Sequence, residues 1–418
     1  MAPCAGRVLA GPEVELISAS AGAESLAAHR LRLGPLPTMA SGALIAEVER
    51  SGLLGRGGAA IPVGPKWRAV AERSSGGAVI LANGAEGEPL SLKDRSLMAA
   101  RPHLVIDGAL LAARAVGADD IIFYVGVEHR AAEAALRHAL AERPGDVRGR
   151  ARIVPAPAGY VSGEESGAVH YLNAGDARPT TTPPRPFERG VGGRPTLVQN
   201  VESLALAALI ARRGHAWYEG LGYGRARGIG LLTVSGAVNH AGVHEAELGA
   251  TLSDAAAAAG GLNGDVRAVL LGGYFGGWAD LDEQWGLPLD PHSMRARGLA
   301  LGCGVVHFLP AQTCGVDATA RLITYLASQS ARQCGPCVFG LSAIADATQR
   351  LAARSPQPGD LERIVRWSGE LTGRGACHHP DGAAVLMQSA LEIFADDVAA
   401  HRRRRCLTLS EPARVAVA

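Results

Sequence analysis

Apolar residues between positions 41 and 225 follow two alternating patterns. Short runs without charged interruptions predict buried strands at Ala78–Ala82 and Ile121–Val127. Arg152–Val154 is the predicted start of a third strand. Between these runs, apolar residues at helical spacing predict helices over His103–Val116 and Arg130–Leu140. Alternation of strand and helix is typical of the α/β class, in which helices sandwich a parallel sheet.

The pattern changes twice after this region. Two strands, a helix and a further strand predict a small β-grasp module, with elements at Leu231–Ser235, Val243–Leu248, Leu252–Ala259 and Val266–Leu271. The last third is helical throughout and predicts a small bundle, with helices over 317–330, 338–353, 360–373 and 382–399. We therefore expect an N-terminal extension with one short helix (1–40), an α/β domain (41–225), a β-grasp domain (226–305), a helical domain (306–400) and a tail (401–418).

Composition narrows the class of function. The 41 basic and 40 acidic residues leave a net charge of +1, which gives no reason to expect nucleic acid or a charged membrane surface as partner. No apolar stretch reaches the roughly 18 residues needed to span a bilayer, and Glu13 and Glu15 interrupt any signal-peptide core. We expect a cytoplasmic protein without direct membrane insertion, at most peripheral to a membrane through a complex. Seven cysteines in such a chain favour metal ligation over disulfides.

Two polar segments lie near the first predicted strand. In Gly55–Lys66 (GRGGAAIPVGPK), closely spaced glycines free backbone N–H groups for an anion, and Lys66 adds a positive charge. In Asn83–Arg95 (NGAEGEPLSLKDR), directly after that strand, Glu86 and Glu88 offer acceptors for ribose or ribityl hydroxyls. A structural turn and a solvated acidic loop are the plainer alternatives for these two segments.

Two later segments repeat this chemistry. Tyr160–Ser166 (YVSGEES) again pairs two carboxylates, Glu164 and Glu165, beyond a strand. Gly193–Ser203 (GRPTLVQNVES) places the amides of Gln199 and Asn200 at a helix start, a position suited to phosphate.

The C-terminal signal is the spacing of three cysteines. Cys334 and Cys337 form a CxxC pair, and Cys377 follows with His378 and His379 directly after it. Two thiolates on one turn with a distant third are typical of a metal ion or cluster site, whereas buried apolar cysteines are the alternative. The remaining cysteines are expected to be incidental or packed as small apolar residues, namely Cys4, Cys303, Cys314 and Cys406.

In this order and spacing, the four segments resemble the motifs of the flavoprotein (51 kDa, F-type) subunit of NADH:quinone oxidoreductase, respiratory complex I. The similarity runs from about Gly52 to about Phe394. It implies a Rossmann-like FMN domain, a β-grasp (SLBB) domain and a helical bundle that holds a [4Fe–4S] cluster. It also implies a partner in trans, a small thioredoxin-like [2Fe–2S] subunit.

The resemblance also assigns roles to individual residues. It places around FMN the residues Gly55, Gly57, Lys66, Asn83, Glu86, Tyr160, Glu164, Gln199 and Asn200. It places toward the nicotinamide nucleotide Gly58 and the two catalytic carboxylates Glu88 and Glu165. It assigns the cluster to Cys334, Cys337 and Cys377.

The chain departs from the family pattern at both ends of this route. The family has a fourth cysteine where this chain has Ala331, so a [3Fe–4S] cluster, a [4Fe–4S] cluster with His378 or His379 as ligand, and no cluster all remain open. Ala85 stands where the family has an acidic residue that would bond the ribityl chain of the flavin. On the nucleotide side, Ile61 and Ala69 replace two aromatic residues of the family. Thr182 replaces a lysine, and Arg185 replaces a turn residue.

Three functions follow from these observations. The first is an NAD(P)H-oxidising flavoprotein that passes electrons through FMN and a cluster to a partner protein. The second is a degenerate electron-transfer or assembly subunit that keeps the fold and FMN but does not oxidise NADH. The third is a zinc-stabilised binding protein that uses the three cysteines and a histidine.

Overall fold

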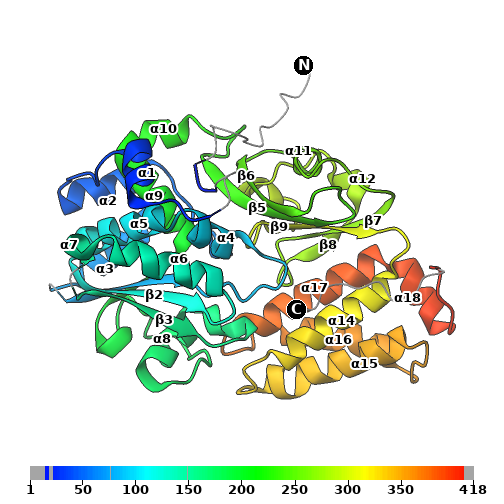
Figure 1. Ribbon diagram of the computed structural model, residues 1–418. Coiled ribbons are helices and arrows are strands. Elements are labelled where there is room, and N and C mark those ends of the chain that lie inside the picture. The colour runs from blue at the N-terminus through cyan, green and yellow to red at the C-terminus, as the bar shows by residue number, and fades with distance from the viewer. Residues whose placement is uncertain (1–14, 18–21, 76, 148, 409–418) are drawn as a thin grey trace.

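The computed structural model describes residues 15–17, 22–75, 77–147 and 149–408, which form three consecutive units (Figure 1). The first unit contains a parallel sheet in the order β3-β2-β1-β4. Its strands are β1 (Ala78–Gly84), β2 (Ala118–Gly126), β3 (Ala151–Ala156) and β4 (Thr196–Asn200). Helices cover both faces, so β1 is buried over nearly its whole length, which explains its uninterrupted apolar run.

One face of this sheet carries the larger core, to which α5 (Pro102–Val116) and α9 (Val201–Arg213) contribute most. The other face is covered by α8 (Glu165–Ala174). The other helices are α1 (Leu26–Leu33), α2 (Ser41–Arg50), α3 (Val63–Ala71), α4 (Lys93–Ala100), α6 (Arg130–Ala141), α7 (Pro144–Val147) and α10 (His215–Glu219). The α/β prediction is confirmed, and α1 is a short helix within the expected N-terminal extension, of which residues 1–14 and 18–21 lie outside the described chain.

The second unit is a mixed sheet in the order β6-β5-β9-β7-β8, with α11 (Leu252–Ala258) packed into its core. Its strands are β5 (Ile229–Gly236), β6 (Gly242–Glu247), β7 (Val266–Leu271), β8 (Gly277–Ala279) and β9 (Val305–Pro310). Two short helices, α12 (Leu281–Gln284) and α13 (Pro291–Arg295), lie in the connection from β8 to β9. The predicted strand–strand–helix–strand order is present. The sheet continues to Pro310, past the boundary expected at residue 305, because β9 is its central strand.

The third unit is the predicted helical bundle, which lies below the second sheet in Figure 1. It contains α14 (Gly315–Ser328), α15 (Ser342–Ala352), α16 (Asp360–Leu371), α17 (His379–Ile393) and α18 (Ala395–Arg402) around one core. A π-helical turn, η4 (Pro336–Leu341), precedes α15. Of the expected tail, residues 409–418 lie outside the described chain. None of the helices described here has the length and apolar character needed to cross a bilayer.

Candidate functional site

The four motifs converge at the carboxyl ends of β1 and β4. The chain adds β2 on one side of β1 and β4 on the other, so β1 borders the point where the strand order reverses. In open α/β sheets, ligands bind at such a switch point. Asn83 and Asn200 are register partners at the two strand ends, and Ala82 pairs with Gln199 one step back. The second and fourth motifs are therefore neighbours across this edge.

The glycine-rich turn between α2 and α3 approaches the same edge. Its start is closed by a bond from the Gly55 N–H to the Ile61 carbonyl at 2.8 Å. A Cβ on Gly57 would lie 3.5 Å from the Asn200 Cβ, so the turn runs against the end of β4. Gly58 has φ +108°, a conformation that side-chain-bearing residues rarely adopt. The backbone of this turn is thus held beside the switch point.

Lys66 and Glu165 join the first and third motifs. Their Nζ and Oε2 atoms lie 2.8 Å apart, from α3 and α8 respectively. Both side chains remain partly accessible, with exposed fractions of 19% and 26%. The predicted catalytic carboxylate Glu165 therefore faces the site paired with the predicted FMN residue Lys66.

Two other carboxylates predicted for the site accept hydrogen bonds from backbone N–H groups at the first turns of helices. Glu86 accepts the Asp94 N–H at 2.9 Å and the Arg95 N–H at 3.1 Å, the first turn of α4. Burial acts to raise its pKa, but Lys93 and Arg95 outweigh this effect and hold the pKa below its usual value. Glu164 caps α8 in the same way, accepting from the Ser166 and Gly167 N–H groups at 2.9 and 3.0 Å. These two side chains are satisfied by the protein itself.

Of the three predicted amide side chains, two have their hydrogen-bond partners within the protein and one does not. Asn83 donates to the Gly163 carbonyl at 2.8 Å, and Asn200 donates to Asp94 at 2.7 Å while its oxygen caps α9. Gln199 is different, because its Oε1 is buried and has no hydrogen-bond partner within the described parts of the chain. Such an orphaned acceptor at the switch point matches a site that a polar cofactor completes.

Glu88 lies where all three units meet. Its Oε2 accepts the Tyr160 hydroxyl at 2.7 Å and the Tyr274 backbone N–H, from the second unit, at 2.8 Å. Burial raises its pKa to about 7. A Cβ on Gly273 would come within 2.7 Å of the carboxylate, so only glycine permits this approach. The carboxyl group is thus fixed in place and changes charge near neutral pH.

The ring of Tyr160 ties the units together. Its centroid lies 4.6 Å from that of Phe275 in the second unit, and 6.3 and 5.6 Å from those of Tyr325 and His379 in the third. Aromatic residues make up only 4% of the chain, so this junction is locally enriched in them. Because its hydroxyl is bound to Glu88, Tyr160 orients that carboxyl group, a role the sequence did not indicate.

The three predicted cluster cysteines lie near η4 and α17. Burial, together with the neighbouring Cys334 and Cys377, raises the pKa of Cys337 to about 12. The Cys377 sulfur accepts the His379 backbone N–H. The three sulfurs are not all within 4.8 Å of one another, unlike a site for a single ion, whereas a cluster binds each thiolate to a different iron. This spacing fits an iron–sulfur cluster better than zinc.

The two histidines offered as replacement ligands are placed differently. The His378 side chain is 95% exposed, and its Nδ1 lies 3.0 Å from an Asp381 carboxylate oxygen. His379 is buried with Nε2 on the Leu326 carbonyl at 2.7 Å, and its Nδ1 has no partner within the described residues.

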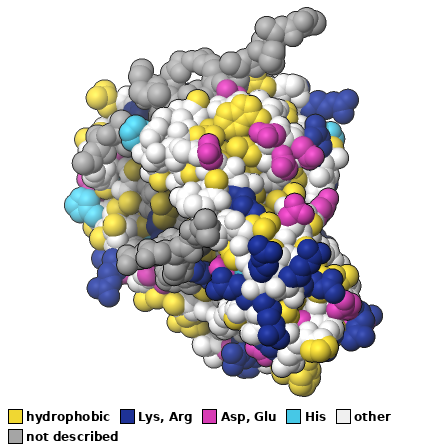
Figure 2. Space-filling model, turned by 90° about the vertical axis from the view of Figure 1, so that its right-hand side faces the viewer, with side chains coloured by type: hydrophobic (Ala, Val, Ile, Leu, Met, Phe, Trp, Pro, Cys, Tyr) yellow, Lys and Arg dark blue, Asp and Glu magenta, His cyan; other side chains and the backbone are white. Residues whose placement is uncertain are grey.

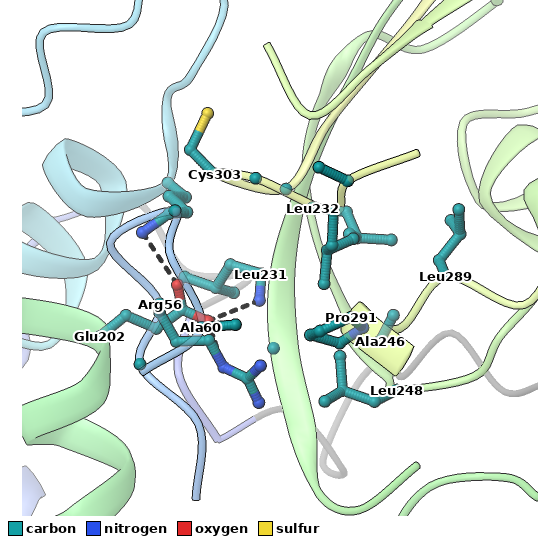
Figure 3. A pocket seen from close by; sticks show the side chains of 18 of the residues that line it. Arg56, Ala60, Glu202, Leu231, Leu232, Ala246, Leu248, Leu289, Pro291 and Cys303 are labelled. Carbon is teal, nitrogen blue, oxygen red and sulfur yellow. Dashed lines mark hydrogen bonds and ion pairs between the residues drawn. The ribbon is translucent and has the colours of Figure 1, made fainter. Parts of the chain in front are cut away.

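A pocket opens between the glycine-rich turn and the second sheet (Figure 3). Arg56 and Glu202 face it from the first unit, and its opposite wall is mostly apolar, with Glu247 and Arg295 as charged exceptions. Glu202 also accepts the Leu231 N–H at 2.8 Å and forms an ion pair with the Lys93 ammonium at 3.0 Å. The predicted site residues that line it are Gly55 and Gly58 alone, so this pocket marks the joint between units rather than the carboxylate site.

Comparison with known proteins identifies the family. Residues 48–208 match the model of the Nuo51 FMN-binding domain, and residues 317–401 match the NADH-ubiquinone oxidoreductase-F iron-sulfur binding region. The F 2 subunit of NADH-quinone oxidoreductase from Rhizobium meliloti (strain 1021) is 32% identical over 375 residues, 86% of this chain and 89% of that protein. The chain belongs to this family of flavoproteins. It is an oxidoreductase subunit with an FMN-binding and an iron–sulfur-binding domain, as the motifs predicted.

Further relatives agree. The F subunit of NADH-quinone oxidoreductase from Mycobacterium tuberculosis (strain ATCC 25618 / H37Rv) is 31% identical over 383 residues, covering 87% of this chain and 85% of that protein. Among solved structures, the NAD+-reducing [NiFe]-hydrogenase in its air-oxidized state matches with a TM-score of 0.80 and 30% identity. The match covers 86% of this chain and 63% of the hydrogenase chain.

Sequence reasoning missed the contribution of the second unit to the site. Tyr274 and Gly273 reach Glu88 from the turn between β7 and β8. The signal was present in the run Gly272–Gly277 (GGYFGG), where paired glycines flank two aromatic residues and predict a tight turn.

Proposed function

We propose that this chain oxidises NADH and passes the electrons to a partner protein. FMN, when bound, takes two electrons together as hydride and releases them singly, which makes it the adaptor between nicotinamide and an iron–sulfur cluster. Gln199 with its unpartnered oxygen, the glycine-rich turn, Asn83 and Asn200 would hold it. Cys334, Cys337 and Cys377 would hold the cluster.

The observation that carries the proposal is the short path from Glu88 to the cysteines. The Glu88 carboxyl group bonds Tyr160, whose ring lies 5.6 Å from that of His379. The His379 backbone N–H in turn bonds the Cys377 sulfur. A nicotinamide-facing carboxylate and a cluster ligand would thus be joined by packed side chains, of which His379 is buried and Tyr160 half-buried.

Two carboxylates divide the remaining work. Glu88, held by the Tyr160 hydroxyl and by the backbone N–H groups of Leu90 and Tyr274, is placed to orient the nicotinamide and to adjust the charge beside it. Glu165 is accessible and neutralised by Lys66 at 2.8 Å, so it accepts a hydrogen bond without repelling a nucleotide phosphate. Gly58 leaves the glycine-rich turn open to the nucleotide.

A partner protein of the thioredoxin-like [2Fe–2S] kind would receive the electrons, within a complex that is at most peripheral to a membrane. Val338 and Phe339 support such a contact, because they follow Cys337 directly and are 40% and 75% exposed. Exposed apolar side chains beside a redox site suit a protein surface.

The second candidate is a protein that keeps the fold but no longer oxidises NADH. Ile61 favours it, since it stands exposed where the family has an aromatic ring to stack on the nucleotide. A steady-state assay of NADH-dependent ferricyanide reduction separates the two. We expect activity that falls strongly in Glu88→Ala and is unchanged in Glu219→Gln, an exposed carboxylate on α10. Flavin-loaded protein that oxidises neither NADH nor NADPH would select the second candidate.

A further inference from the structure

A second group of metal-ligating side chains lies at the far end of the helical unit from the motifs. The Sγ atoms of Cys314 and Cys406 and a ring nitrogen of His401 all lie within 4.8 Å of one another. Cys314 and His401 are buried and Cys406 is half-buried. Over the described residues, no other three His, Cys, Asp or Glu side chains meet this criterion.

The distances suit a single tetrahedral ion. Cys314 Sγ lies 3.3 Å from His401 Nε2. Ligands of zinc sit about 2.3 Å (sulfur) and about 2.0 Å (nitrogen) from the ion, which places neighbouring ligand atoms roughly 3.5 Å apart. The ion therefore needs only small side-chain shifts to enter. Thiolate and imidazole ligands together favour zinc over hard cations.

The histidine is already oriented as a ligand. His401 Nδ1 bonds the Leu351 carbonyl at 3.0 Å, which requires the proton on Nδ1 and leaves the Nε2 lone pair facing Cys314. A backbone carbonyl on the second ring nitrogen is the usual support of metal-bound histidine. Cys314 is supported too, because its sulfur accepts the Asp317 N–H at the start of α14.

A neighbouring carboxylate adds negative charge. Asp397 lies one turn before His401 on α18 and is fully buried, and its charge acts on the Cys314 thiol. Its Oδ2 bonds Arg267, while Oδ1 has no partner among the described residues. Arg267 balances the charge of this carboxylate through Oδ2, and the buried Oδ1, which lacks a hydrogen bond, is costly unless a donor or an ion reaches it.

We propose that Cys314, His401 and Cys406 bind one zinc ion, with water in the fourth position, at a site separate from the iron–sulfur cysteines. The ion closes the spacing His401-x4-Cys406 and so fixes both ends of the exposed tract Arg402–Arg405 against the start of α14. Basic side chains gather on the face of the molecule where α18 lies (Figure 2). The zinc ion would thus hold the segment after α18 against the helical bundle.

Zinc K-edge absorption spectroscopy with elemental analysis tests this on the full chain, purified anaerobically under reducing conditions with zinc supplied. We expect about one zinc per chain in a shell of two sulfurs and lighter atoms. Cys406→Ser, close to the end of the described chain, should lose the zinc and keep flavin and iron. Cys377→Ser should do the reverse, losing iron and keeping zinc.

Three results would overturn the proposal. They are wild-type protein without zinc, zinc content that Cys406→Ser and His401→Ala both leave unchanged, and a Cys314–Cys406 disulfide in protein kept reduced. His401→Ala is a second variant in case Cys406→Ser folds poorly. The zinc content of whichever variant has a near-native circular dichroism spectrum decides the question.

Discussion

At the scale of single residues, Glu88 makes the sharpest prediction. Burial raises its pKa to about 7, so the carboxyl group is neutral below that pH and charged above it. The nicotinamide ring is cationic in NAD+ and neutral in NADH. Affinity for NAD+ should therefore rise, by roughly tenfold, as the pH increases through about 7. Calorimetric titration of NAD+ across this range measures it.

The control for this effect is Glu88→Gln, which keeps the shape and removes the charge. It should show nearly the same NAD+ affinity at all pH values. An unchanged inflection near pH 7 in that variant would mean that another group titrates beside the nucleotide.

Ile61 carries the second residue-scale prediction. Its side chain is 48% exposed on the glycine-rich turn, where an aromatic face would stack the nucleotide. Ile61→Phe should restore a stack worth about 1 to 3 kcal/mol and lower KM for NADH by roughly fivefold or more, with little change in kcat. Leu31→Phe, on the exposed face of α1, is the matched control. Equal KM values in both variants would contradict the assignment of this position.

At the scale of elements, Lys93 joins α4 to α9. Its buried ammonium lies 2.6 Å from Asp94 and 3.0 Å from Glu202, and these charges raise its pKa although burial acts to lower it. Lys93→Met would leave the buried Asp94 without its cation and Glu202 with Arg56 alone, at a cost of about 3 to 5 kcal/mol in the free energy of unfolding.

Urea denaturation of the protein measures this cost. Arg137→Met, which breaks an exposed pair with Glu133 within α6, is the control and should cost less than about 1 kcal/mol. Equal losses in the two variants would show that the buried network contributes no more than a surface pair.

The same scale shows what the sequence could and could not predict. Elements with long periodic or uninterrupted apolar patterns, such as β1 and α5, were found because burial dictates those patterns. β4 was missed because its short run leads directly into α9, so the pairing of Asn83 with Asn200 was also hidden. Cys314 and His401 are 87 positions apart, and only packing of α14 against α18 brings them together.

Within the site, the motifs located the segments but not the bonding of each side chain. Four motifs in order were enough to indicate the family. They could not show that Glu86 and Glu164 cap helices, since capping depends on the exact start of α4 and α8. The residues around Cys406 likewise contain no pattern that would indicate a metal ligand.

At the scale of the whole molecule, the proposed nicotinamide site and the proposed contact with the electron-accepting partner lie in different places. Phe339 stands exposed two residues after Cys337, one of the predicted cluster ligands, whereas Glu88 is buried at the junction of the units. Phe339→Asp should therefore leave NADH:ferricyanide activity near wild type and reduce electron transfer to the partner several-fold, since a charge replaces an apolar contact. Val365→Asp, exposed on α16, is the control. Equal transfer rates in both variants would place the partner elsewhere.

The most direct test of the account is an anaerobic addition of NADH to the flavin- and iron-loaded protein, followed by optical and EPR spectra of the same sample. The route from Glu88 through Tyr160 to Cys377 predicts that NADH bleaches the flavin and that the EPR signal of the iron–sulfur cluster changes with it. Flavin absorbance that NADH leaves unchanged, while dithionite bleaches it normally, would contradict the account.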